Sequence, residues 1–177
     1  FQYFFLHFLS VISYSTPFVR PLTQNKHTMN IEIIPFVGFN QVKFGMSLEK
    51  IKELLGEPTE TVREKHEDDS EDVSLMYGDL GAELSFMSED DFRLGLITCF
   101  APTFTLDEQS YAGMSEADFL KDAKFDDLIL EETFEELNAK DYTIDSKGLS
   151  VWIQDGFVDS ITMFPNHIDE DTVEWPA

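Results

Sequence analysis

The sequence predicts an α+β protein made of two tandem units, each a helix packed on an antiparallel sheet. Gly45-Met46-Ser47 recurs 68 positions later as Gly113-Met114-Ser115, and each copy precedes a short helix-like stretch followed by strand-like runs. A tyrosine then follows in each copy, Tyr77 and Tyr142. Each copy closes on a similar strand, Ile-Thr-Cys-Phe at 97–100 and Ile-Thr-Met-Phe at 161–164. These matches come in one order at spacings of 64 to 68 residues, which indicates one supersecondary unit used twice.

The distribution of acidic residues separates the first 28 residues from the rest of the chain. Residues 1–28 contain no acid, the first being Glu32, and their bases are Arg20 and Lys26. We therefore expect 1–28 to be a leader, either non-native or disordered, with a truncated targeting segment as the alternative. Its apolar run precedes its bases, unlike a signal peptide, and is too short for a transmembrane helix. The other expected divisions are 29–101 for the first α+β repeat, 102–165 for the second and 166–177 for an acidic tail.

The first unit is expected to open with strands at 31–37 and 41–44. Ser47 is a good N-cap, and apolar residues then recur at helical spacing from Leu48 to Leu55. Gly56 should end this helix, and Pro58 prevents its continuation. The acidic stretch 66–72 reads as a solvated loop, and 78–81 as a hairpin turn. The remaining strands are expected at 59–65, 73–77, 82–87 and 94–100.

The second unit follows the same plan from a first strand at 102–106. Ser115 is again an N-cap, and Asp118 three residues on completes a pair like a capping box. Residues from Leu128 onward fit either a strand or a helix that includes Phe134 and Leu137, and periodicity does not decide between them. Asp155-Gly156 is typical of a tight hairpin. The remaining strands are expected at 142–144, 149–153 and 157–164, with an irregular acidic tail after them.

The charge balance limits the kinds of partner. The 177 residues include 35 acids and 12 bases, a formal net charge of −23. This charge repels nucleic acid and anionic membranes and attracts basic proteins. We expect a basic protein partner, possibly a toxin, no nucleic acid and no membrane; the alternative is that the charge only keeps the protein dispersed. The single Cys99 excludes an internal disulfide and fits a cytoplasmic protein, exported only if residues 1–28 are a genuine signal.

One part of the pattern resembles a known family. Phe44-Gly45-Met46-Ser47, followed by Leu54-Leu55-Gly56 and Pro58, resembles the opening of the small-protein-A / β-lactamase-inhibitor-protein-like (BLIP-like) superfamily. There, a Gly-Met-Thr/Ser turn starts a helix that ends in Leu-Gly-x-Pro. The tandem arrangement is similar to the inhibitor protein, so the resemblance implies a concave sheet surface that grips a protein target. The second copy departs, because Lys121-Asp122-Ala123 replaces Leu-Gly-x-Pro, and the inhibitor's paired cysteines are absent.

The chemistry-bearing residues favour binding over catalysis. The sequence contains no nucleophile elbow, phosphate-binding glycine loop or zinc pattern, so we expect no catalytic residue, cofactor or metal ligand. The run 67–72 could bind Ca²⁺ weakly, but it lacks the glycine of an EF-hand loop. Acids cluster in three predicted loops that would form a negative surface if they met at one end of the sheet, and aromatic anchors favour interfaces. The candidate partner-binding residues are Glu67, Asp68, Asp69, Glu71, Asp72, Glu89, Asp90, Asp91, Trp152 and Tyr142.

These observations predict a non-enzymatic acidic protein-binding module. The most concrete version is a bacterial immunity or inhibitor-type protein that neutralises a basic partner. Two other classes stay open. A cell-envelope assembly or structural protein of small-protein-A type would require a genuine export signal, and an unrecognised hydrolase would require a closed pocket lined by buried carboxylates.

Overall fold

The computed structural model describes residues 30–122, 124–169 and 172–177, so the predicted leader lies outside the described part. Two α-helices are described, α2 (Leu48–Leu55) and α3 (Glu116–Asp122), with 3-10 turns η1 (Ser88–Asp90), η2 (Glu135–Leu137) and η3 (Asp145–Lys147). The strands are β1 (Ile31–Ile34), β2 (Gly38–Phe39), β3 (Val42–Lys43), β4 (Glu60–Lys65), β5 (Glu71–Tyr77), β6 (Ala82–Met87), β7 (Arg93–Cys99), β8 (Phe104–Thr105), β9 (Leu128–Phe134), β10 (Ala139–Ile144), β11 (Leu149–Gln154), β12 (Phe157–Met163), β13 (Asn166–His167) and β14 (Val173–Glu174).

The predicted α+β class is wrong, because the described chain is mainly β. The two α-helices have eight and seven residues, whereas the main sheet has eight strands in the order β4-β5-β6-β7-β12-β11-β10-β9. The last strands of the two repeats, β7 and β12, pair antiparallel, with Ile97 opposite Met163. The two predicted sheets therefore merge into one, and a helix of two turns covers only a small part of either half.

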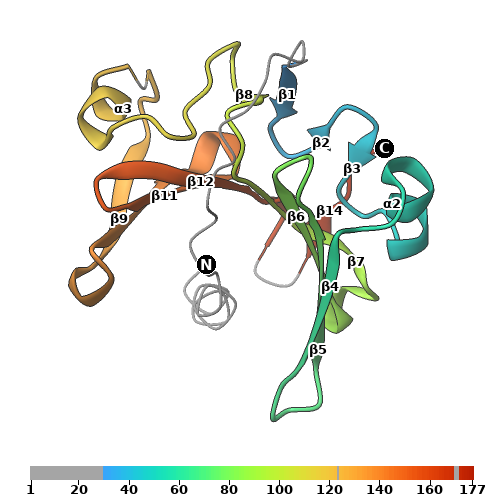
Figure 1. The fold of residues 1–177 in the computed structure, drawn as a ribbon. Coiled ribbons are helices and arrows are strands. Elements are labelled where there is room, and N and C mark those ends of the chain that lie inside the picture. The colour runs from blue at the N-terminus through green and yellow to red at the C-terminus, as the bar shows by residue number, and fades with distance from the viewer. Residues whose placement is uncertain (1–29, 123, 170–171) are drawn as a thin grey trace.

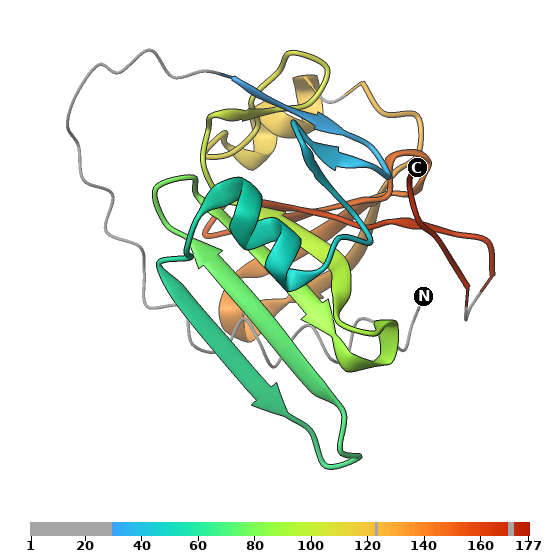
Figure 2. The ribbon, with the colours of Figure 1, turned by 90° about the vertical axis from the view of Figure 1, so that its right-hand side faces the viewer.

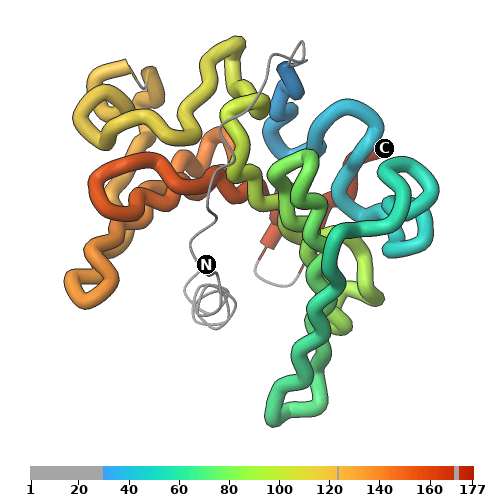
Figure 3. Tube along the Cα trace, in the orientation of Figure 1, coloured from blue at the N-terminus to red at the C-terminus, as the bar shows by residue number. Residues whose placement is uncertain are grey.

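The main sheet arches, with its first half (β4–β7, green) and its second half (β9–β12, orange to red) turning toward each other (Figure 1). Both helices and the small sheet β3-β2-β1-β8 lie on the outer side of the arch (Figures 1 and 2). The tube in Figure 3 follows the same path and shows the β4–β5 hairpin extending beyond the other strands. The hydrophobic core fills the space between the outer layer and the sheet. We call the opposite side of the sheet the helix-free face.

Both helices begin as the sequence predicts. The Ser47 hydroxyl accepts a hydrogen bond from the Lys50 backbone N–H at 3.3 Å. The Ser115 hydroxyl accepts from the Asp118 N–H at 3.2 Å and donates to the Asp118 carboxylate at 2.7 Å. These caps satisfy backbone donors that a helix start leaves unpaired. Ile51 and Phe119 occupy the same position after the two caps and are fully buried, so each helix inserts one large side chain into the core.

The repeated Gly-Met-Ser segment has the same structural role in both units. In the first, the Gly45 N–H donates to the Leu94 carbonyl and the Leu94 N–H to the Met46 carbonyl, at 2.9 and 2.8 Å. In the second, Gly113, Val158 and Met114 make the corresponding bonds at 2.7 and 2.8 Å. The glycines have φ of 80° and 82°, a region that disfavours side chains. The segment thus attaches the start of each helix to the last strand of its own unit.

The tyrosine match is wrong as a structural equivalence. Tyr77 ends β5 opposite Ala82, whereas Tyr142 lies within β10 opposite Val151. In the ladders, the residue equivalent to Tyr77 is Ile144, which pairs with Leu149. The two tyrosines are therefore offset by two positions, and period-two alternation keeps them on the same face of the sheet.

The sequence leaves residues from Leu128 onward open between strand and helix, and it predicts an irregular acidic tail. Residues 128–134 form strand β9, and Leu137 lies in the following 3-10 turn rather than in a helix. The tail is not irregular throughout, because β13 and β14 form a small hairpin. Trp175 then packs over Gly45, where an added Cβ would lie 3.0 Å from the indole ring. Tertiary contact with the first unit therefore orders the end of the tail.

Candidate functional site

Two of the three predicted acidic loops meet at one end of the first unit. The tip of the β4–β5 hairpin and the β6–β7 connection lie together because β5 pairs with β6, with Asp72 opposite Met87. The Glu71 N–H also donates to the Ser88 hydroxyl at 2.8 Å, joining the two loops. We call this region the acidic end; it comprises Glu67, Asp68, Asp69, Glu71, Asp72, Glu89, Asp90 and Asp91.

Some carboxylates of the acidic end are neutralised within the molecule. Arg63 binds Glu71 at 2.6 Å, Lys65 binds Asp69 at 2.7 Å, and His66 lies 3.0 Å from Asp72. The hydrogen bond to Asp72 raises the pKa of His66. Within the described residues, the exposed side chains of Glu67, Glu89 and Asp91 make no ion pair with a cation. The acidic end therefore keeps a net negative charge.

The third acidic cluster approaches the same region through the β13–β14 hairpin. His167 of β13 is close enough to Asp90 for their charges to affect each other. Burial raises the pKa of Asp90, opposed by His167 and Arg93, and burial lowers the pKa of His167. Of the predicted 169–174 cluster, residues 170 and 171 lie outside the described part.

The helix-free face carries an unusual set of buried polar groups. Side chains alternate along a strand, so residues between core positions point to this face. Six of the seven buried polar or charged residues of the described chain belong to it: Ser74, Thr98, Asp141, Ser150, Ser160 and Thr162. Buried polar groups cost free energy unless they are hydrogen-bonded. The centre of this face is therefore specialised compared with an ordinary solvated sheet surface.

A local two-fold relation organises this polar face. Thr98 pairs with Thr162, its equivalent in the other repeat, and their hydroxyls lie 3.1 Å apart. Outward from this seam, Glu83 pairs with Thr98, and Ser150 pairs with Thr162. One strand further out, Ser74 in the first half corresponds to Asp141 in the second. At these two equivalent positions, each half thus has one serine and one carboxyl group, on exchanged strands.

Asp141 has the least satisfied polar side chain on the helix-free face. Its residue is 0% exposed; the Ser150 hydroxyl donates to Oδ1 at 2.5 Å, and Oδ2 has no hydrogen-bond partner in the described chain. Burial raises the pKa of Asp141 to about 7; the Ser150 hydrogen bond opposes this, and the charges of Glu131 and Glu132 add to it. Glu132 lies directly opposite Asp141, and both glutamates are exposed on edge strand β9. Three acids therefore meet here, with a buried acceptor left unused.

Trp152 and Tyr142 do not join the acidic end. Trp152 lies on the helix-free face next to Asp141, is 6% exposed, and packs against Phe134 with ring centroids 5.2 Å apart. Tyr142 is on the core side, and its hydroxyl donates to Glu116 at 2.7 Å. Burial is the main cause that raises the pKa of Tyr142 to about 12. The two aromatics therefore lie on opposite faces, and Tyr142 is part of the core.

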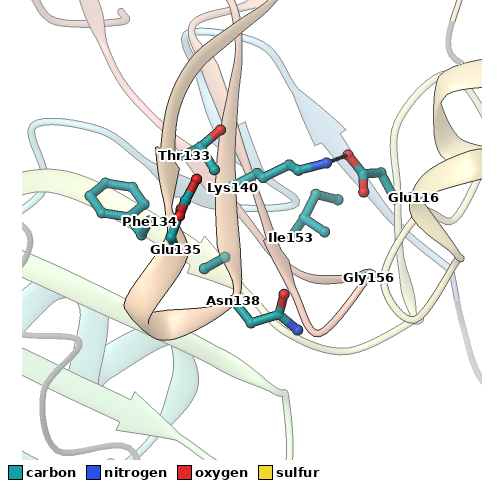
Figure 4. A pocket seen from close by; sticks show the side chains of 9 residues that line it. Glu116, Thr133, Phe134, Glu135, Asn138, Lys140, Ile153 and Gly156 are labelled. Carbon is teal, nitrogen blue, oxygen red and sulfur yellow. Dashed lines mark hydrogen bonds and ion pairs between the residues drawn. The ribbon is translucent and has the colours of Figure 1, made fainter.

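A hollow of about 350 Å³ near Tyr142 is lined by residues that include Glu116, Asn138, Lys140 and Gly156 (Figure 4). Lys140 reaches across it to Glu116 at 2.7 Å, the ion pair drawn in Figure 4. The Lys140 and Tyr142 hydrogen bonds lower the pKa of Glu116. Because Lys140, the cation that lines this hollow, is already bound to Glu116, we do not take it as the functional site.

The described residues include few reactive groups. Cys99 is buried, and burial raises the pKa of its thiol, which lowers its reactivity. Within 30–122, 124–169 and 172–177, no three His, Cys, Asp or Glu side chains are placed to hold a metal ion. In the same ranges, every helix falls short of the length and apolarity needed to cross a membrane.

Comparisons with known proteins identify no relative. No family model, no curated protein and no solved structure matches the chain. The geometry of the chain itself is therefore the basis for the functional argument below.

Sequence reasoning missed Asp141 and Glu83 as site residues. Glu83 lies in the predicted strand 82–87, and Asp141 immediately precedes the predicted strand 142–144. Both alternate with core residues, since Glu83 comes before Leu84 and Asp141 before Tyr142. A carboxylate at an alternating position signals a polar or functional face of a sheet. The low exposure of that face could not be predicted from the pattern, because alternation along a strand shows which residues share a face and not whether that face is covered.

Proposed function

We propose that the chain is a non-enzymatic acidic protein-binding module, of the immunity or inhibitor type, that neutralises a basic partner such as a bacterial toxin in the cytoplasm. The observation that carries the proposal is the meeting of two acidic loops at one end of the first unit, joined by the Glu71–Ser88 hydrogen bond. Clustered like charges attract an oppositely charged surface and raise its association rate.

The helix-free face supports the proposal from the other half of the sheet. It combines acids with aromatic and apolar side chains, including Asp141, Trp152 and Phe134. A concave sheet with such side chains fits a protein surface better than it fits a small ligand. The Gly-Met-Ser turns resemble those of the inhibitor superfamily. We use this resemblance as a further reason to propose an inhibitor-type function.

The test uses the basic product of a gene adjacent to the one that encodes this chain. The purified full chain and this product should form a complex in size-exclusion chromatography. Its Kd should rise at least tenfold between 50 and 500 mM salt, because screening weakens charge attraction. A complex whose affinity ignores salt would contradict the electrostatic proposal.

A matched pair of variants locates the surface. Neutralising Glu67, Glu89 and Asp91 as Gln, Gln and Asn removes three exposed charges from the acidic end. The control neutralises Glu108, Asp122 and Asp126, which are exposed in the second unit. The first variant should weaken binding several-fold more than the control, although both lose the same charge. Equal effects would mean that only net charge matters and that the acidic end is not a site.

A further inference from the structure

The unpaired carboxylate oxygen of Asp141 calls for an explanation. A polar atom buried without a partner costs folding free energy, and natural proteins leave few of them. Ser150 occupies Oδ1 at 2.5 Å, and Oδ2 is the unused acceptor. The neighbouring acids increase the cost, because Glu131 and Glu132 repel a negative charge on Asp141.

Among the described residues, the charged groups whose electrostatic effect reaches Asp141 are two acids, Glu131 and Glu132. Strand β9 brings Glu131 and Glu132, where a register shift beside Asp141 places both glutamates opposite one stretch of β10. Strand β11 brings Ser150 and Trp152 and contains no titratable residue. Lys140, the nearest cation in sequence, lies on the other face and is bound to Glu116. The described chain therefore supplies no cation to this group of carboxyls.

We propose that Asp141, Glu131 and Glu132 form a subsite for one arginine side chain of the basic partner, which enters past the exposed glutamates of edge strand β9 as the side chains over the buried Oδ2 move aside. This inference rests on the proposed function and names the chemistry of one contact within it. A guanidinium has five N–H donors in a plane and can bind two carboxylates at once. Trp152 and Phe134 add aromatic surface beside the acids, and a guanidinium stacks on such rings better than an ammonium does.

Arginine binding at Asp141 should release a proton, whereas charge attraction at exposed acids should not. Because the pKa of Asp141 is about 7 in the free protein, much of this carboxyl is protonated at pH 6.5. A guanidinium beside Oδ2 favours the charged form, so the proton leaves Asp141 for the buffer as the complex forms. Tighter binding as pH rises from 5.5 to 7.5 follows by linkage.

The chain offers a matched control in its first half. Glu83 is also on the helix-free face, next to the seam, and burial also raises its pKa. It does not have the edge glutamates that flank Asp141, because the strand beside it carries Ser74 and Met76. Glu83→Gln and Asp141→Asn therefore remove the same formal charge from the same face.

The experiment is calorimetric titration of the full chain with a hexa-arginine peptide at 150 mM salt and pH 6.5, in two buffers of different ionisation enthalpy. The wild type should release up to about three-quarters of a proton per site, because about that fraction of Asp141 is protonated at pH 6.5. Asp141→Asn should abolish this release and weaken binding about tenfold. Glu83→Gln should change affinity less than twofold and keep the release. Hexa-lysine should bind the wild type more weakly and lose less affinity in Asp141→Asn.

The outcomes separate the inference from the proposed function. If hexa-arginine binds and Asp141→Asn behaves like Glu83→Gln, the subsite is wrong while the acidic-module proposal stands. If neither peptide nor the basic partner binds the wild type at this salt, the proposed function itself fails. Should Asp141→Asn not fold, Glu131→Gln with Glu132→Gln gives a surface variant that must also weaken arginine binding; unchanged affinity there overturns the subsite.

Discussion

The two halves of the main sheet share one framework and differ in what they place on it. Both begin a helix with a Gly-Met-Ser turn, and both tie that turn to their last strand with the same pair of backbone hydrogen bonds. The first half extends into the acidic end, and its turn is covered by Trp175. The second half places on the helix-free face a buried carboxyl group with one oxygen that has no hydrogen-bond partner in the described chain. One backbone framework thus carries different side chains in its two copies.

The equivalent helix residues test whether the halves depend on their cores equally. Phe119 contacts the rings of Tyr111 and Tyr142, with centroids at 5.6 and 6.0 Å, while Ile51 is the equivalent aliphatic residue. Phe119→Ala should lower the free energy of unfolding by about 3–5 kcal/mol, and Ile51→Ala by about 2–4 kcal/mol. Urea denaturation measures both. Two separate unfolding transitions in either variant would contradict the view that the β7–β12 pairing joins the halves.

Replacing Asp141 or Glu83, the carboxyl groups on exchanged strands of the two halves, should change the pH dependence of stability by different amounts. Folding raises the pKa of Asp141 from 3.8 to about 7, so stability from the bound proton is present at acidic pH and is lost as pH rises from about 4 to 7. Asp141→Asn cannot ionise, so it should be about 1–3 kcal/mol more stable than the wild type at pH 8. The difference should vanish near pH 4. Thermal unfolding across this range gives the comparison, and a difference independent of pH would show that Asp141 is not the titrating group.

Glu83→Gln sharpens the same comparison. Burial raises the pKa of Glu83 as well, so this variant should gain stability in the same direction as pH rises. Its gain should be smaller, because Glu83 lacks the pair of glutamates that faces Asp141. A larger gain for Glu83→Gln would reverse our ranking of the two halves.

The Thr98–Thr162 pair, where β7 and β12 join the two halves, should give a smaller effect on stability. Thr98→Val removes one of two hydroxyls 3.1 Å apart and leaves the Thr162 hydroxyl buried without that partner. Either single valine variant should cost about 1 kcal/mol, and the double variant should cost less than the sum of the singles. A double-mutant cycle from urea denaturation measures this coupling. Additive losses would mean that the two hydroxyls do not interact.

The helix caps should give the smallest differences. Ser47→Ala and Ser115→Ala each remove a cap worth about 0.5–2 kcal/mol. Ser115 should cost a few tenths of a kcal/mol more, because its hydroxyl also donates to Asp118. Circular dichroism during thermal unfolding can rank the two variants, with Asp118→Ala as a check on the second bond. Equal losses for the two serines would show that this reciprocal bond adds nothing.

Much of the local structure was predictable because it depends on neighbouring residues. The helix caps, the Gly56 helix end and the Asp155-Gly156 turn all rely on contacts within a few positions, and both turn residues have positive φ as a tight hairpin requires. The acidic runs of the sequence could be assigned to loops for the same reason. Their meeting at one end was only a conditional expectation, since it depends on which strands pair.

The sequence by itself determined the repeat, the turns that start both helices and the excess of acidic charge. Tertiary structure alone decided that β7 and β12 would pair, which merged the two sheets and overturned the α+β prediction. It also decided that Trp152 and Tyr142 would lie on opposite faces and that Asp141 would be buried beside two glutamates. The reason is physical: capping and turn preferences act over three or four residues, whereas burial depends on how all the strands pack, and the β7–β12 pairing joins residues from 62 (Cys99 and Ile161) to 66 (Ile97 and Met163) positions apart.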